Sequence, residues 1–235
     1  MVPINANPKI LAFDTASARA SVALLEGREF RAEIRLQSMK THSIHLLGSI
    51  SFLLARAGWT LKDLNLVAAG IGPGSFTGIR IGIATALGLA QSLSIPFAGI
   101  SGTDVLASRA AWFDGRIGVL LDAHRDQFYY AEYCSSNGKA SAKRKPALLN
   151  VSDLEQCLGD RHLYIVGDLS RQRLQEIIRF SDGWPRLIPV DLFLACGIGS
   201  LALAGKRKWR SGDNLVSEPM YIRPPDALRN RKPKR

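Results

Sequence analysis

Hydrophobic residues in the first part of the chain form short blocks separated by turn residues. An apolar block over 9–14 ends in Asp14, and two more blocks, 21–25 and 30–36, flank the turn Glu26-Gly27-Arg28. Blocks of this length bounded by polar and glycine residues are typical of strands. The opening of the chain therefore predicts three consecutive strands joined by short turns.

The next segment, 41–57, has the periodicity of a helix. Gly58 follows it, and glycine is the usual residue just past the last helical turn. Phe52 falls outside the main apolar face and indicates a second apolar surface. The main face comprises Leu46, Leu47, Ile50, Leu53, Leu54 and Ala57.

The stretch 66–95 is the most constrained part of the sequence. A buried strand over 66–71 leads into the turn Gly72-Pro73-Gly74-Ser75-Phe76-Thr77-Gly78-Ile79-Arg80 and then into a long helix that reaches Leu93. Three glycines and a proline fix an unusual backbone path. A hydroxyl from Ser75 or Thr77 is expected to cap the free amides of the helix. The helix is apolar but short for a membrane span, so we expect it to be buried in protein.

Small residues recur at every fourth position of this helix, at Gly78, Gly82, Ala86 and Ala90. An interior glycine costs a helix about 1 kcal/mol relative to alanine, so close packing should repay these glycines. Such a smooth stripe lets another helix approach closely. The sequence leaves two alternatives open for that helix: the 41–57 helix of this chain, or a helix of another subunit.

After Asp114-Gly115 the pattern begins again, because an apolar strand over 116–122 ends in Asp122 as the first strand ends in Asp14. Further elements are expected as strands over 128–133 and 163–167, a polar, basic hairpin loop over 134–145, and helices over 151–158, 170–180 and 190–204. This weak internal repeat indicates two related βββαβα halves.

Two such halves describe a two-lobed α/β fold of the actin-like ATPase, or ribonuclease H-like, type. The lobes are expected over 1–108 and 109–235, with the 190–205 helix as a candidate to pack back on the first lobe. In this architecture each lobe presents an acidic turn to a nucleotide phosphate and its metal.

Asp14 and Asp122 are the carboxylates that could do this, since ligands of α/β folds lie at the carboxyl ends of strands. Together they would hold a hydrated magnesium ion, whereas the alternative is that each accepts hydrogen bonds from amides of its own turn. The residues that follow them are Thr15-Ala16-Ser17 and Ala123-His124-Arg125, where active members usually place glycine. The nucleotide site is therefore expected to be degenerate. A small-molecule kinase or ATPase that uses both aspartates is the alternative function.

The glycine-rich turn is a second feature that could bind an anion, because helix N-termini offer free amides. It lacks the Lys-Ser/Thr ending of a P-loop, so a tight connection between strand and helix is at least as well supported. The candidate vestigial nucleotide or anion site comprises Asp14, Thr15, Gly72, Gly74, Ser75, Thr77, Arg80 and Asp122.

Composition narrows the function classes further. The net charge of +11 is concentrated at 139–145, at 206–210 and in the tail from Arg223, which suits an RNA or acidic protein partner; a basic proteome or a solvated tail accounts for it equally well. On charge alone, an independent RNA-binding module is a third function to consider. The three cysteines form no C-x-x-C pair, and His42 and His45 lack a third ligand, so no metal site is expected.

Four segments together resemble a known family, TsaB, also called YeaZ: ILAFDTASARASVALLEG (10–27), GIGPGSFTGIRIGIATALGLAQSLSIPFAGIS (70–101), LLDAHRDQFYYAEY (120–133) and EPMYIR (218–223). They occur in the family's order along nearly the whole chain. The family is a bacterial accessory protein of tRNA threonylcarbamoyladenosine biosynthesis.

The resemblance implies a cytoplasmic subunit without catalytic residues, resident metal, cofactor or membrane contact, in which weak ATP or Mg²⁺ binding is restricted to a complex interface. It implies a TsaD-type transferase paralogue as partner, a TsaE-type P-loop ATPase that joins the complex, a homodimer when the chain is alone, and indirect contact with tRNA. The family contact uses the two helices at about 41–57 and 77–93. The residues expected at this interface are His45, Ser49, Phe52, Gly78, Gly82, Ala86 and Ala90.

Overall fold

The computed structural model describes residues 7–17, 19–37, 42–158, 163–169, 186–205 and 219–222. It divides the chain into two compact units, one formed by Met1–Val105 with Asp191–Pro219 and the other by Leu106–Val190 with Met220–Arg235. The helix expected over 170–180, the basic cluster at 206–210 and the tail from Arg223 lie outside the described residues.

The first unit is built on a five-stranded sheet of order β3-β2-β1-β4-β5. Strands β1, β2 and β3 are antiparallel neighbours, and β4 and β5 run parallel to β1, so the predicted opening of three strands is confirmed. Gly27 joins β2 to β3 with a φ of +58°, which glycine adopts at little cost. The strands are β1 (Lys9–Asp14), β2 (Arg19–Glu26), β3 (Glu29–Gln37), β4 (Leu66–Gly70) and β5 (Phe97–Ile100).

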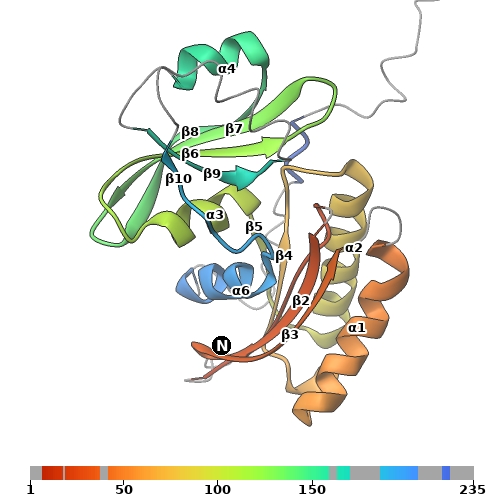
Figure 1. Ribbon diagram of the computed structural model, residues 1–235. Helices are drawn as coiled ribbons and strands as arrows, with labels where there is room; N and C mark the ends of the chain where they lie inside the picture. Colours follow the sequence, from red (N-terminus) through yellow and green to blue (C-terminus); the bar gives the residue numbers. More distant parts are fainter. Residues whose placement is uncertain are drawn as a thin grey trace, which may run out of the picture. The chain divides into compact units, whose positions relative to one another are not determined.

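Helices cover both faces of this sheet (Figure 1). Helices α1 (His42–Ala57) and α2 (Phe76–Leu93) lie on one face, and α6 (Ala195–Ala204) packs on the other, against β1, β2 and β4. A short 3-10 turn, η1 (Leu61–Asp63), precedes β4. The core under α1 contains Leu46, Ile50, Leu53 and Leu54, as predicted, but Leu47 is 59% exposed. Leu47 therefore belongs to the surface of α1 and not to its core-facing stripe.

The second unit repeats the strand arrangement of the first. Its sheet has the order β10-β9-β6-β7-β8, so in both units the first strand is central, with the next two strands on one side and the last two on the other. This shared order confirms the duplicated, two-lobed α/β fold. The strands are β6 (Gly115–Asp122), β7 (Gln127–Ser136), β8 (Lys139–Asn150), β9 (Leu163–Asp168) and β10 (Arg186–Leu187). Helix α4 (Val151–Leu158) packs on β7 and β8, and α3 (Gly102–Ala110) spans the division between the units.

Two expected elements differ in extent from the structure. The hairpin loop predicted over 134–145 is wrong, because β7 continues to Ser136 and β8 begins at Lys139. Asn137 and Gly138 both have positive φ, +51° and +72°, and Asn-Gly is a strong signal for a tight hairpin turn. The last helix begins at Ala195 and not at Val190.

Candidate functional site: a closed nucleotide turn and an open groove

Asp14 lies at the end of β1 and is almost fully buried, with 1% of its surface exposed. Its Oδ1 accepts a hydrogen bond from Ala16 N at 3.3 Å, and its Oδ2 accepts one from Ser17 Oγ at 3.4 Å. Loss of hydration raises the pKa of Asp14 from 3.8 to about 6, although these hydrogen bonds oppose the shift. The carboxylate thus holds its own turn together and is not presented to solvent.

The glycine-rich turn packs directly onto the turn that follows Asp14. Ser75 N donates to Ala16 O at 2.7 Å, and Thr15 Oγ1 donates to Gly78 O at 2.7 Å. A Cβ at Gly74 would lie 2.2 Å from Ala16 O, and one at Gly78 would lie 2.0 Å from Thr15 O. Glycine is therefore required at both positions, because backbone meets backbone there, and the chain itself fills the space on this side of the Asp14 turn.

The other residues of the glycine-rich turn either form hydrogen bonds within the chain or are exposed to solvent. Gly72 has a φ of +104° and its carbonyl oxygen accepts a hydrogen bond from Gly102 N at 2.9 Å. Ser75 is the cap of α2, as one of the two predictions had it, and its Oγ accepts from Gly78 N at 3.2 Å. Thr77 and Arg80 are exposed, and the Arg80 guanidinium lies 5.2 Å from the centre of the Phe76 ring.

Asp122 belongs to the second unit, and its carboxylate also accepts a hydrogen bond from the turn that follows it. Its Oδ1 accepts a hydrogen bond from His124 N at 2.7 Å. After Ala123, the three consecutive residues His124, Arg125 and Asp126 have positive φ values between +55° and +59°, so the turn is tight and carries side chains at each position. No group of three or more His, Cys, Asp or Glu side chains that could hold a metal ion occurs among the residues that the structure describes. These turns do not favour the kinase or ATPase alternative.

The small-residue stripe of α2 faces the sheet of its own unit. Gly78, Gly82, Ala86 and Ala90 are all buried, and a Cβ at Gly82 would lie 2.5 Å from Thr15 Oγ1. The stripe lets α2 approach the turn after β1 at Gly78 and Gly82, and Ala86 and Ala90 share a core cluster with residues of α1. In this chain the core of the first unit occupies that face, and the expectation that these four residues contact a partner stays a prediction. By length and composition alone, helix α2 is apolar enough to cross a membrane, and about 33% of it is buried in the first unit.

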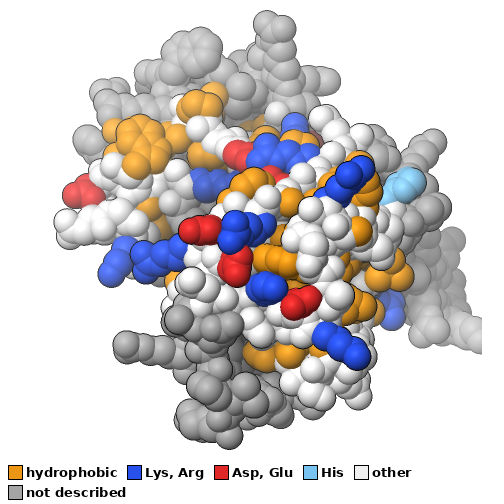
Figure 2. Space-filling model, turned by 90° about the horizontal axis from the view of Figure 1, so that it is seen from below, with side chains coloured by type: hydrophobic (Ala, Val, Ile, Leu, Met, Phe, Trp, Pro, Cys, Tyr) orange, Lys and Arg blue, Asp and Glu red, His pale blue; other side chains and the backbone are white. Residues whose placement is uncertain are grey.

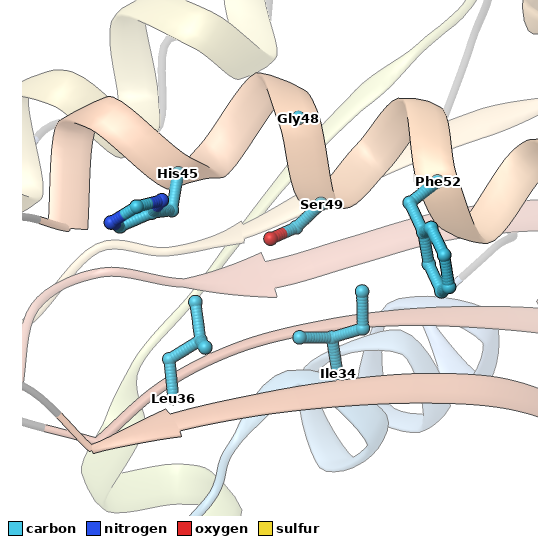
Figure 3. Close-up of a pocket in the computed structure, with 6 residues that line it drawn as sticks. All are labelled: Ile34, Leu36, His45, Gly48, Ser49 and Phe52. Carbon is cyan, nitrogen blue, oxygen red and sulfur yellow. The ribbon is translucent and has the colours of Figure 1, made fainter.

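A groove with a volume of about 390 Å³ lies between α1 and β3. Three residues that the sequence placed at the interface, His45, Ser49 and Phe52, line it and point from α1 toward β3 (Figure 3). Gly48 lines it too, and nothing lies within 4 Å of the position that its Cβ would occupy. The lining is completed from β3 by Ile34 and Leu36.

One large apolar side chain that lines this groove, Phe52, is strongly exposed. Phe52 is 52% exposed; Leu47, which is 59% exposed, belongs to α1 but is not among the residues that line the groove. The Arg56 guanidinium lies 5.3 Å from the centre of the Phe52 ring. Exposed apolar side chains that gather beside a groove mark a surface for binding another molecule. Around the centre of the face shown in Figure 2, basic and acidic side chains lie next to one another, with hydrophobic atoms between them.

Sequence reasoning missed Ile34, Leu36 and Leu47. A usable signal was present for the two strand residues, because Ala32, Ile34 and Leu36 alternate along β3 and share the face that carries α1. Leu47 continued an apolar pattern on α1, and only the position of the sheet shows that it faces outward.

Comparison with known proteins gives consistent matches in sequence. Residues 36–172 match the family model described as TsaD, tRNA N6-adenosine threonylcarbamoyltransferase. The chain is 33% identical over 181 residues to the tRNA threonylcarbamoyladenosine biosynthesis protein TsaB of Buchnera aphidicola subsp. Schizaphis graminum, covering 76% of this chain and 80% of that protein. It is 37% identical over 129 residues to TsaB of Bacillus subtilis, covering 55% and 56%, and 39% identical over 127 residues to TsaB of Escherichia coli, covering 53% and 54%. The aligned part thus spans about half the length of the latter two relatives.

Two solved structures are similar over most of the chain. A crystal structure described as an uncharacterized protein with similarity to peptidase YEAZ from Pseudomonas aeruginosa has a TM-score of 0.70 and 25% identity, covering 92% of this chain and all of the other. YeaZ from the same organism has a TM-score of 0.68 and 26% identity, covering 87% and 95%.

Proposed function

Since the chain belongs to the TsaB family, we propose that it takes part in tRNA threonylcarbamoyladenosine biosynthesis as a non-catalytic subunit. In this role it binds and activates a TsaD-type transferase, which performs the chemistry on the adenosine beside the anticodon. The proposal extends to a cytoplasmic location, to a TsaE-type ATPase that joins the complex, and to a homodimer when the transferase is absent.

The observation that carries the proposal is the contrast between the closed turn and the open groove. The Asp14 carboxylate accepts hydrogen bonds from its own turn, and backbone of the glycine-rich turn lies against that turn. A reaction centre needs access for substrate, which this turn does not offer. The α1–β3 groove, in contrast, is open and lined mainly by apolar side chains, with His45 and Ser49 as its polar members. Such a surface suits a protein partner better than a small substrate.

The partner contact is assigned to α1 with the α1–β3 groove. Phe52 would be its central anchor, because aromatic side chains at the centre of an interface contribute a large part of the binding free energy. His45 and Ser49 would be polar neighbours inside the groove, and Leu47 would add apolar contact area on the exposed side of α1.

The test is a matched pair of variants, Phe52→Arg and Phe30→Arg. Both phenylalanines are 52% exposed in the first unit, but only Phe52 lines the groove. We expect Phe52→Arg to weaken binding to the TsaD-type paralogue at least about tenfold, as for other buried aromatic anchors, and Phe30→Arg to leave it unchanged. Binding is measured by calorimetry on the purified proteins, and circular dichroism checks that each variant remains folded. Equal binding by the two variants would contradict the assignment of the groove.

A further inference from the structure

The strand β8 carries a basic surface that partner binding through α1 does not use. Its cations are all exposed, and the segment 137–150 contains no aspartate or glutamate. β8 is the edge strand of the second sheet, with β7 as its single neighbour there. The cations, which we call the basic edge, are Lys139, Lys143, Arg144 and Lys145.

Among the residues that the structure describes, no acidic side chain neutralises the three lysines of the basic edge. Some cations elsewhere are paired: Arg116 lies 2.8 Å from Glu132, and Lys9 lies 3.4 Å from Asp63. Glu132 is the residue opposite Arg144 in the β7–β8 register, yet its Oε1 is held by the Arg116 guanidinium. Within the described parts of the chain, no carboxylate lies within ion-pair distance of the lysines. Charges this close act together, since the screening length is about 8 Å at physiological salt.

The backbone of β8 holds these side chains in a defined place. Glu132 and Tyr133, consecutive on β7, are opposite Arg144 and Ala142, so Lys143 is an extra residue in a β-bulge. The Arg144 side chain lies against the unit, with its Nη1 3.3 Å from Cys157 Sγ and its guanidinium 5.8 Å from the centre of the Tyr130 ring. Arg144 is therefore anchored, while Lys143 and Lys145 extend on either side of it along the chain.

An edge strand also uses lysines for a purely structural purpose, because they discourage pairing with strands of other molecules. Charge of either sign serves that role, although lysine is the residue used most often. It does not by itself explain why residues 137–150 contain basic side chains and no acidic ones. The neighbouring tyrosines of β7, Tyr129, Tyr130 and Tyr133, are buried, so bases could not stack on them. The chemistry available is contact with phosphates, which positions a nucleic acid without reading its sequence.

We propose that the basic edge of β8 binds the phosphate backbone of the RNA substrate, a folded tRNA. This inference rests on the proposed function, which brings a tRNA to the complex, and it adds a direct contact from this chain. Phosphate contacts by lysines release counterions, so the affinity depends steeply on salt.

The test compares two double charge reversals in the full chain. Lys143→Glu with Lys145→Glu alters the basic edge, and Arg28→Glu with Lys62→Glu makes the same change in net charge at exposed positions of the first unit. Affinity for a tRNA transcript is measured by fluorescence anisotropy from about 50 to about 200 mM salt. We expect the basic-edge variant to bind about tenfold more weakly or worse, with a salt slope lower by about two, and the control variant to change little.

The same two variants are also tested for binding to the TsaD-type paralogue. Retained partner binding together with lost RNA binding supports the inference. RNA binding that is equal in the two variants, or absent in the unmodified chain, overturns it and leaves the lysines as protection of an edge strand. Neither result touches the proposed function, which fails only if the unmodified chain does not bind the transferase.

Discussion

At the scale of single residues, Asp14 shows how burial changes the meaning of a sequence motif. A carboxylate at the end of a strand suggests a metal ligand, but here it is enclosed and accepts hydrogen bonds from Ala16 and Ser17. Gly70 packs against it so closely that a Cβ there would lie 2.2 Å from Oδ1. The residue stabilises a turn, and its ionisation is coupled to folding.

The raised pKa of Asp14 predicts how stability depends on pH. Its pKa is about 6 in the folded chain against an ordinary value of 3.8, so the folded state binds the proton more tightly. The free energy of unfolding should therefore fall as pH rises from about 4 through about 6, by about 3 kcal/mol from this group.

The Asp14→Asn variant, which cannot ionise, should lack this part of the pH dependence. Urea unfolding of both proteins at about pH 4 and about pH 7 measures the difference. If the unmodified chain and Asp14→Asn lose the same stability between these pH values, the prediction is wrong.

At the scale of elements, α2 is positioned by glycines that differ in their surroundings. Gly78 meets backbone of the Asp14 turn, whereas Gly88, on the same helix, is exposed, with nothing within 4 Å of the position that its Cβ would occupy. The two glycines look alike in the sequence, but only the first is needed for packing.

This difference predicts opposite effects of the same substitution. Gly78→Ala should lower the free energy of unfolding by about 1–3 kcal/mol, because the methyl group would overlap a carbonyl oxygen that is fixed in a turn. Gly88→Ala should raise it by about 0.5–1 kcal/mol through helix propensity. Thermal and urea unfolding of the two variants measure both. A stabilising Gly78→Ala would show that the contact between the two turns relaxes easily.

At the scale of the whole molecule, the chain returns to its first unit after completing most of the second. Arg35 of β3 lies 2.6 Å from Asp191, and Ala195 N donates to Ser21 Oγ at 3.0 Å. Helix α6 then covers β1 and β2, where a Cβ at Gly199 would lie 2.4 Å from Leu25 Cδ1. The first sheet is thus covered on both faces only when this late segment is present.

The fully buried Ile198 of α6 should therefore be important for the first unit. Ile198→Ala should lower the free energy of unfolding by about 2–5 kcal/mol, whereas Leu203→Ala, at a half-buried position of the same helix, should cost less. Denaturant unfolding measures both. Equal, small losses would mean that α6 packs loosely on the sheet.

Much of the architecture could be predicted because it depends on local pattern. The opening three strands, the α1 core residues from Leu46 to Leu54 and the Ser75 cap follow from hydrophobic periodicity and from the hydrogen-bonding needs of a helix end. The repeated strand that ends in aspartate predicted the duplicated fold, and both sheets have the same strand order.

By itself, then, the sequence determined the elements, their duplication and the family. Only the tertiary structure decided which surfaces remain open. In the sequence, α1 and α2 look equally apolar. The fold of the first unit buries Gly78 and Ala86 of α2 and leaves Phe52 of α1 exposed. Which face a helix presents depends on contacts between residues far apart in sequence, such as Thr15 with Gly78, and periodicity carries no information about those contacts.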